Sequence, residues 1–212
     1  MKVILIADQH NIGHGPHFLF KSLQIIKSQK IRCKFGLEIP SMDALGKFLY
    51  NDILEENKNV TLNDPMCRLA QIRARKMFIE YSLKLFDIFV ADIQNGKSFE
   101  IRENSMAEVI YKQFLKTPLP DVIVMLVGTL HIPGIIEKLK QLNGNINVIC
   151  FAPMIQSMGF FKNVISCFVK EQGFFFSQKN IDKAEKKIRN FLDSKSAKIE
   201  LLANNIDISL RT

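Results

Sequence analysis

Short, uninterrupted runs of apolar residues alternate along the chain with longer segments in which apolar residues recur every three or four positions. The short runs are rich in valine and isoleucine and are bounded by polar residues, which is typical of strands buried on both faces of a parallel sheet. They predict strands at 2–7, 32–39, 122–127 and 146–151. Strands that alternate with helices at this spacing favour an α/β protein with a largely parallel central sheet flanked by helices.

Start signals place the first helices. Pro16 suits the first turn of a helix that runs to Ser28, because proline lacks the N–H that a first turn leaves unbonded. Ser41 is placed as the N-cap of a helix that continues to about Glu55. A long helix opens at 64–65 and is expected to carry a set of basic residues on its outer face. These are Arg68, Arg73, Arg75 and Lys76.

The middle of the chain leaves one choice open. Residues 87–92 predict either a strand or the tail of the preceding helix. Ser105 with Glu108 three residues later is a capping-box pattern, which predicts that the next helix begins there and that Arg102 lies just before it or in its first turn. Further helices are predicted over 134–142 and 181–193.

The chain is expected to form one domain over 1–212, with a core at 1–152 and an aromatic-rich C-terminal extension at 153–212. The extension contains a cluster of phenylalanines on either side of two glycines. The cluster consists of Phe160, Phe161, Phe168, Phe174, Phe175 and Phe176. These rings either pack a sheet edge against the core or form a ligand-entry or homodimer surface, since exposed aromatic patches mark contacts.

Composition narrows the class of protein. The net charge of +8 comes from lysines spread along the chain without a nucleic-acid motif, so no specific nucleic-acid partner is expected. The four cysteines show no C-x-x-C spacing, which indicates a reducing compartment. The first apolar run meets Asp8 too early for a signal peptide, and no apolar run approaches the ~18 residues of a membrane span. A soluble, cytoplasmic protein is expected.

Candidate chemistry gathers at the predicted carboxyl ends of the strands, where open α/β sheets bind ligands. Asp8 and His10 follow the first strand, Glu38 ends the second, and His131 follows the 122–127 strand after Gly128. Separate segments therefore deliver acids and imidazoles to one rim of one sheet. A glycine at that rim indicates a close approach of backbone to a ligand.

Each candidate also has a structural interpretation. Glu38 is expected to be buried, so it needs a cation, and a purely structural pair with Arg102 would satisfy it. Asp8 could cap a loop, and His14 fits a structural or solvent-facing role better than a catalytic one. A metal held by His10, Glu38 and His131 is the most plausible metal site, since zinc on the early histidines alone is a weak signal.

Four motifs resemble one superfamily, which joins ChaN-like haem-uptake proteins, erythromycin esterases and TraB/Tiki proteins. Ala7-Asp8-Gln9-His10 resembles its Gly-Glu-x-His loop, and Leu37-Glu38 resembles its second-strand glutamate. The segment 102–107 resembles its Arg-(Asp/Asn)-x-x-Met-Ala motif, which includes Asn104, and 127–131 resembles its Gly-x-x-His motif. The order and spacing agree over about 3–142. Ala7 and Asp8 depart from the usual glycine and glutamate.

The resemblance implies a shared acid–histidine site built from His10, Glu38, Arg102 and His131, with Asp8 in place of the glutamate. Members of the superfamily split into esterases, Tiki-type metal-dependent peptidases and haem-binding proteins. The cofactor stays unknown, with a divalent metal favoured over haem. Haem ligation by tyrosine is disfavoured, because the three tyrosines fall inside predicted helices.

The leading functional hypothesis is a hydrolase that cleaves an ester or amide bond of a small-molecule or peptide substrate. Glu38 or His10 would be the general base for water, His131 the second acid/base, and Arg102 would orient Glu38 or stabilise an oxyanion. The alternative is a haem- or metal-binding protein without catalysis. A third hypothesis is an inactive interaction domain that dimerises through its phenylalanines.

Overall fold

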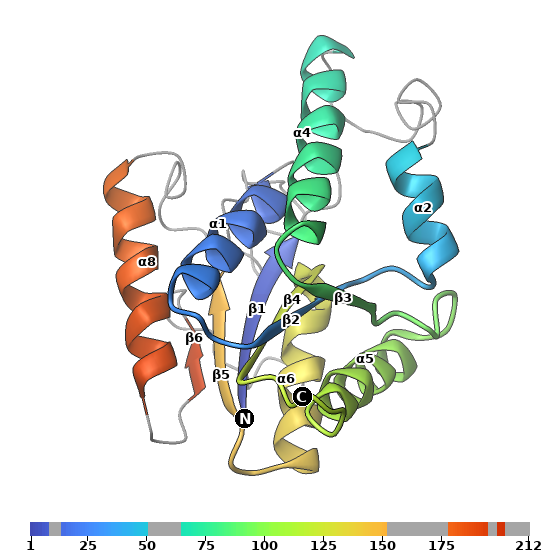
Figure 1. Ribbon diagram of the computed structural model, residues 1–212. Helices are drawn as coiled ribbons and strands as arrows, with labels where there is room; N and C mark the ends of the chain where they lie inside the picture. The colour runs from blue at the N-terminus through green and yellow to red at the C-terminus, as the bar shows by residue number, and fades with distance from the viewer. Residues whose placement is uncertain (9–13, 51–64, 152–177, 195–198, 202–212) are drawn as a thin grey trace.

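The structure is a computed structural model that describes residues 1–8, 14–50, 65–151, 178–194 and 199–201. It contains a six-stranded sheet with the order β3-β2-β4-β1-β5-β6, in which every neighbouring pair is parallel (Figure 1). The strands are β1 (Lys2–Asp8), β2 (Cys33–Leu37), β3 (Asp87–Val90), β4 (Val122–Gly128), β5 (Asn147–Phe151) and β6 (Ile199–Leu201). The expected α/β fold with a parallel sheet is confirmed.

Helices cover both faces of the sheet (Figure 1). They are α1 (His14–Ser28), α2 (Met42–Tyr50), α4 (Pro65–Leu83), α5 (Phe99–Gln113), α6 (Ile132–Leu142) and α8 (Gln178–Asp193), with a 3₁₀ turn η1 (Thr129–His131) before α6. The first face packs against α1, α2, α4 and α8, and the opposite face packs against α5 and α6. No helix in the described part of the chain is long and apolar enough to span a membrane.

The strands supply two cores because successive side chains point to opposite faces. In β4, Val124 and Leu126 enter the core beneath α1, whereas Met125 and Val127 enter the core beneath α6. Since both faces are covered, β1 and β4 read as continuous apolar runs rather than alternating ones. Full burial of one such side chain stabilises the fold by roughly 1.5–3 kcal/mol.

The neighbouring strands β1 and β4 form the topological switch point of the sheet. They run in register, with Asp8 beside Gly128 at their carboxyl ends. From β1 the chain passes through α1 to β2, and from β4 it passes through α6 on the other face to β5, in the opposite direction along the sheet. The two connections run on opposite faces of the sheet, and such folds bind ligands at neighbouring strand ends whose connections leave to opposite faces.

The predicted start of the fifth helix was wrong. It begins at Phe99 after Ser98, so Ser105 lies inside the helix rather than at its N-cap. The buried stripe of α5 runs through Glu103, Met106 and Ile110. Its first member is a carboxylate, which a search for recurring apolar residues does not detect. Arg102 donates its backbone N–H to the Ser98 carbonyl at 3.1 Å, which places it in the first turn, as one of the two predicted positions had it.

Other expectations have mixed outcomes. Residues 87–90 form a strand, so the open choice is settled in favour of β3. Ser41 does cap α2, because its Oγ accepts the N–H of Ala44 at 3.0 Å. The outward placement of the α4 cations is wrong for Arg75 and Lys76, which are partly and almost wholly buried. The predicted helix residues 51–55 and the phenylalanine cluster lie outside the described residues.

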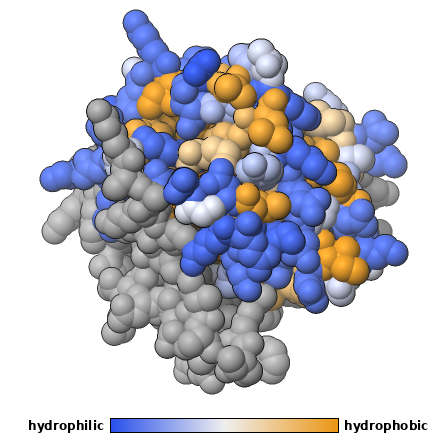
Figure 2. Space-filling view, turned by 90° about the horizontal axis from the view of Figure 1, so that it is seen from below, coloured by the Kyte–Doolittle hydropathy of each residue, from blue (hydrophilic) through white to orange (hydrophobic). Residues whose placement is uncertain are grey.

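The amino ends of the strands lie at the opposite edge of the sheet from the switch point. Figure 2 looks onto this lower face, where hydrophilic residues surround smaller apolar patches. The surfaces at the two ends of the strands therefore differ in whether their charged groups are buried or exposed. The carboxyl end holds buried acids, and the amino end holds exposed charge.

Candidate functional site

Five residues from four separate segments meet at the carboxyl ends of β2, β3 and β4. Glu38 follows β2, Asp92 follows β3, and His131 ends η1 directly after β4. Arg102 and Glu103 reach the same place from the first turns of α5. The convergence of Glu38, Arg102 and His131 that the sequence predicted is present in the structure.

Glu38 is the hub of the site. Its side chain is 5% exposed. Its Oε1 accepts a hydrogen bond from Arg102 Nη2 at 2.7 Å, and its Oε2 accepts one from the backbone N–H of Gly128. His131 Nε2 lies 3.3 Å from the same Oε1. Two hydrogen-bond donors and an imidazole nitrogen, from three elements, therefore surround one buried carboxylate, and the donors lower the cost of burying its charge.

Arg102 joins Glu38 to a second buried acid. Its Nε and Nη2 donate to the two oxygens of Asp92 at 3.1 and 2.8 Å, which is the bidentate geometry that guanidinium groups favour. The Asp92 side chain is 3% exposed. Hydrogen bonding to Asp92, followed by the charges of Asp92 and Glu38, raises the pKa of Arg102 above its ordinary value, against the effect of burial. Arg102 is thus a fixed cation between two acids.

His131 lies between two carboxylates and is almost fully buried. Its Nε2 faces Glu38, and its Nδ1 lies 3.5 Å from Glu103 Oε1, which is too long for a strong hydrogen bond. Nδ1 has no hydrogen-bond partner among the described residues. The half-exposed ring of Phe99 stacks on the imidazole with centroids 4.6 Å apart and covers its outer face.

Glycine at the start of α6 allows Glu103 to reach the site. A Cβ on Gly134 would collide with the carboxylate of Glu103, so only glycine lets α5 and α6 approach this closely here. Glu103 is 3% exposed and lies against the first turn of α6. Helix N-termini carry partial positive charge, which stabilises a carboxylate in that position.

Asp8 forms a second acid–guanidinium pair on the other side of the switch point. Arg75 of α4 donates its Nη1 to Asp8 Oδ1 at 3.0 Å and lies 2.7 Å from Oδ2 through Nη2. The Asp8 side chain is 2% exposed, so this pair is also buried. Thr129 Oγ1 donates to the Asp8 backbone carbonyl at 3.3 Å, which ties the end of β1 to η1. Asp8 is therefore held by an arginine at the end of β1.

The described site carries more negative than positive formal charge. Its carboxylates are Asp8, Glu38, Asp92 and Glu103, and its guanidinium groups are Arg75 and Arg102. His131 lies between two of these acids, Glu38 and Glu103.

Two of the sequence-predicted side chains lie outside the described residues, and a third takes no part in the described site. His10 lies outside the described residues, as does the side chain of His14. Asn104 lies beside Glu103 on α5 but takes part in no hydrogen bond or ion pair with the described residues of the site. His17 stacks on Phe78 with centroids 4.4 Å apart, which is a structural role on the α1–α4 interface.

Sequence reasoning missed Glu103, Phe99 and Arg75 as parts of the site. Glu103 could have been found, since it is the one charged residue in the buried stripe of α5 and sits beside Arg102. Phe99 and Arg75 gave no such signal, because an aromatic at a helix start and a basic residue within a long helix are ordinary features. Their places depend on tertiary packing.

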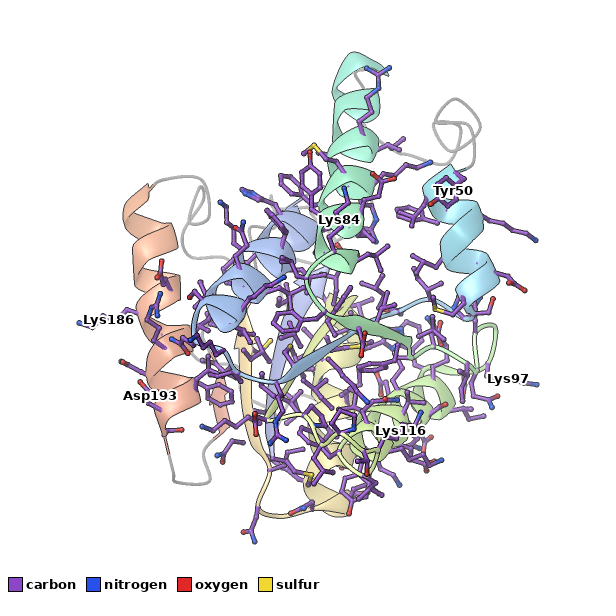
Figure 3. All side chains as sticks on the ribbon, in the orientation of Figure 1. Tyr50, Lys84, Lys97, Lys116, Lys186 and Asp193 are labelled. Atoms are coloured by element: carbon purple, nitrogen blue, oxygen red, sulfur yellow. The ribbon has the colours of Figure 1, made fainter. Side chains whose placement is uncertain are left out.

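The described residues alone do not fit a metal site. No group of three or more possible ligands for a metal ion occurs among them. Glu38 already bonds Arg102 and the Gly128 N–H, so a metal there would displace existing donors. The tyrosines lie in helices, as expected, and the outward-facing Tyr50 at the end of α2 is 83% exposed (Figure 3).

Comparisons with family models, with curated proteins and with solved structures found no match for this chain. Its function is therefore inferred from the site itself.

Proposed function

We propose that the protein is a hydrolase that cleaves an ester or amide bond at the switch point between β1 and β4. The observation that carries the proposal is the buried Nδ1 of His131, which has no hydrogen-bond partner among the described residues. Buried polar atoms in proteins are nearly always bonded, and a catalytic role is one of the few reasons for an exception. A water molecule activated by this nitrogen would be the nucleophile.

Glu38 orients the catalytic imidazole in this proposal. Its Oε1 lies 3.3 Å from His131 Nε2, so a proton on Nε2 leaves the lone pair on Nδ1 available as a base. The carboxylate then stabilises the imidazolium that forms when Nδ1 takes a proton from water. This assigns Glu38 a positioning role, whereas the sequence alone favoured Glu38 or His10 as the base.

Arg102 holds Glu38 in place rather than contacting the substrate. Its Nε and Nη2 are used by Asp92 and Glu38, so it acts as a clamp across the ends of β2 and β3. Preorganised charges of this kind need no rearrangement when charge develops during the reaction. The four-motif resemblance to the ChaN-like, esterase and Tiki superfamily is a further line of support for hydrolysis by a cytoplasmic enzyme of a small-molecule or peptide substrate.

The test is hydrolysis of a panel of p-nitrophenyl esters, lactones and peptide amides by the wild type and by matched pairs of variants. His131→Asn is compared with His17→Asn, and Glu38→Gln with Glu137→Gln, which lies exposed on α6. We expect the first member of each pair to lose ~10²–10⁴-fold in rate and the second to retain it. Circular dichroism checks that each variant is folded.

Two results would contradict the proposal. Folded wild-type protein that hydrolyses nothing in the panel argues against a hydrolase, and an active His131→Asn variant argues against the assigned base. Dialysis against a chelator, with elemental analysis of the protein before and after, separates metal-dependent from metal-free hydrolysis. The His10→Ala variant is included in the chelator experiment, because the predicted metal site of His10, Glu38 and His131 requires His10.

A further inference from the structure

A groove lies at the opposite end of the sheet from the catalytic candidate, where β2, β3 and β4 begin. It has a volume of about 370 Å³, within the range of small-molecule sites. Since β4 is seven residues long, the groove and the end of β4 are separated by about 20 Å. The two places are therefore distinct.

Four cationic side chains line the groove. Lys27 and Lys30 come from the end of α1, and Arg32 and Lys34 come from the start of β2. Asp87 is the single carboxylate among the lining residues. Within the described part of the chain, no ion pair joins any of the three lysines to an acid, so their ammonium groups are available to a ligand.

The arginine of the groove is held in a fixed orientation. Arg32 Nε and Nη2 donate to the two oxygens of Asp121 at 3.1 and 2.9 Å. The Asp121 hydrogen bond raises the pKa of Arg32, so the guanidinium keeps its charge. Nη1 has no partner among the described residues. Even after Asp87 and Asp121 are counted against the four cations, two positive charges remain in excess.

Lys30 occupies a backbone conformation that disfavours it. Its φ of 57° lies in the left-handed region, where glycine or asparagine usually ends a helix. It is the one non-glycine residue with positive φ in the described part of the chain. A lysine is less favourable than glycine in this conformation, and backbone strain of this kind is a pointer to function.

The floor of the groove is apolar. Ile31, Phe86 and Pro120 are among the residues that line it. A ligand that matches both features carries an anion at one end and an apolar or aromatic body at the other. Guanidinium and ammonium groups together favour phosphate, which accepts several charge-assisted hydrogen bonds.

We propose that this amino-end groove is a second binding site, and that it takes a small organic phosphate whose apolar part lies against Phe86. The site stands apart from the proposed hydrolytic centre and does not depend on it. The groove lies at the amino ends of the strands, on the side of the molecule from which Figure 2 is seen.

Isothermal titration calorimetry at constant ionic strength tests the site with phenyl phosphate as the probe, because screening by salt changes exposed charge interactions. Inorganic phosphate, phenol and a single-stranded oligonucleotide are the comparison ligands. The test variant is Lys30→Gln with Lys34→Gln. The control is Lys140→Gln with Lys186→Gln, which removes the same charge from exposed positions on α6 and α8. Figure 3 labels Lys186 on α8.

We expect phenyl phosphate to bind the wild type more tightly than either inorganic phosphate or phenol does. The test variant should lose about tenfold or more in affinity, while the control changes by less than about twofold. Equal losses in the two variants would show charge attraction without a site. Binding of the oligonucleotide without binding of phenyl phosphate would identify a nucleic-acid surface instead. A test variant that is less stable but binds phenyl phosphate normally would show that the lysines only cap the helix. Each of these three results overturns the proposal.

Discussion

Replacing Arg102 with methionine removes the one cation that joins two buried acids while keeping an unbranched side chain of similar length. Arg102 makes three hydrogen bonds to Glu38 and Asp92, whose side chains are 5% and 3% exposed. Removal of one partner from a buried ion pair costs about 3–5 kcal/mol, because the remaining charges stay buried without compensation. That is a large fraction of the ~5–15 kcal/mol that stabilises a whole domain.

The free energy of unfolding is measured by urea titration followed by far-ultraviolet circular dichroism, since the chain contains no tryptophan. With a slope of about 2 kcal/mol per molar, a loss of about 4 kcal/mol lowers the midpoint by about 2 M urea. The matched control is Arg32→Met, which breaks another bidentate arginine–aspartate pair. Its side chains are 62% and 49% exposed, so its midpoint should hardly move.

The comparison isolates burial, because both substitutions break the same kind of pair. Similar midpoints for Arg102→Met and wild type would refute the reasoning, since the acids would then need no guanidinium. Equal losses in Arg102→Met and Arg32→Met would refute it differently. They would show that the geometry of the pair, and not its burial, sets how much the pair contributes to the free energy of unfolding.

Three further predictions use the same unfolding assay or a labelling experiment. Gly134→Ala should destabilise the protein by about 1–3 kcal/mol, because the new methyl group collides with Glu103. Gly46→Ala in α2 should stabilise it by about 0.5–1 kcal/mol, because the new methyl group meets nothing within 4 Å. A destabilising Gly46→Ala would contradict the packing argument. Lys30→Gly should stabilise by up to about 1 kcal/mol, and no gain would mean that its positive φ carries no strain. Burial raises the pKa of the Cys150 thiol to about 12, so peptide mapping should find it unmodified by iodoacetamide until the protein is unfolded. Rapid modification of the native protein would contradict this.

The sheet could be predicted from sequence because its strands are buried on both faces. An unbroken apolar run as short as the one in β4, bounded by polar residues and glycine, is typical of a strand in the middle of a parallel sheet. β3 was harder, since its four residues follow a long helix and only its pairing with β2 distinguishes it from a helical tail. β6 was not predicted, because three residues carry no usable periodicity.

The candidate site could be predicted in part for a related reason. Residues that directly follow parallel strands must share one edge, so Glu38 and His131 could be brought together without knowledge of the packing. Glu103 depends on how α5 lies against α6, and Arg75 depends on how α4 crosses the end of β1. Neither placement follows from a strand end. The sequence therefore predicts the residues on the strand ends better than the helix residues that pack over them.

The pairing of charges explains why these residues meet at the switch point and stay there. The carboxyl ends of β1, β4 and β2 lie next to one another in the sheet, so polar groups that follow these strands can meet there. Each acid is then held by a group from a different element: Asp8 by Arg75, and Glu38 by Arg102 and the Gly128 N–H. Among the described residues of the site, His131 Nδ1 is left as the buried atom with an unmet hydrogen bond. In the proposed hydrolysis, this is the atom that would take the proton from water.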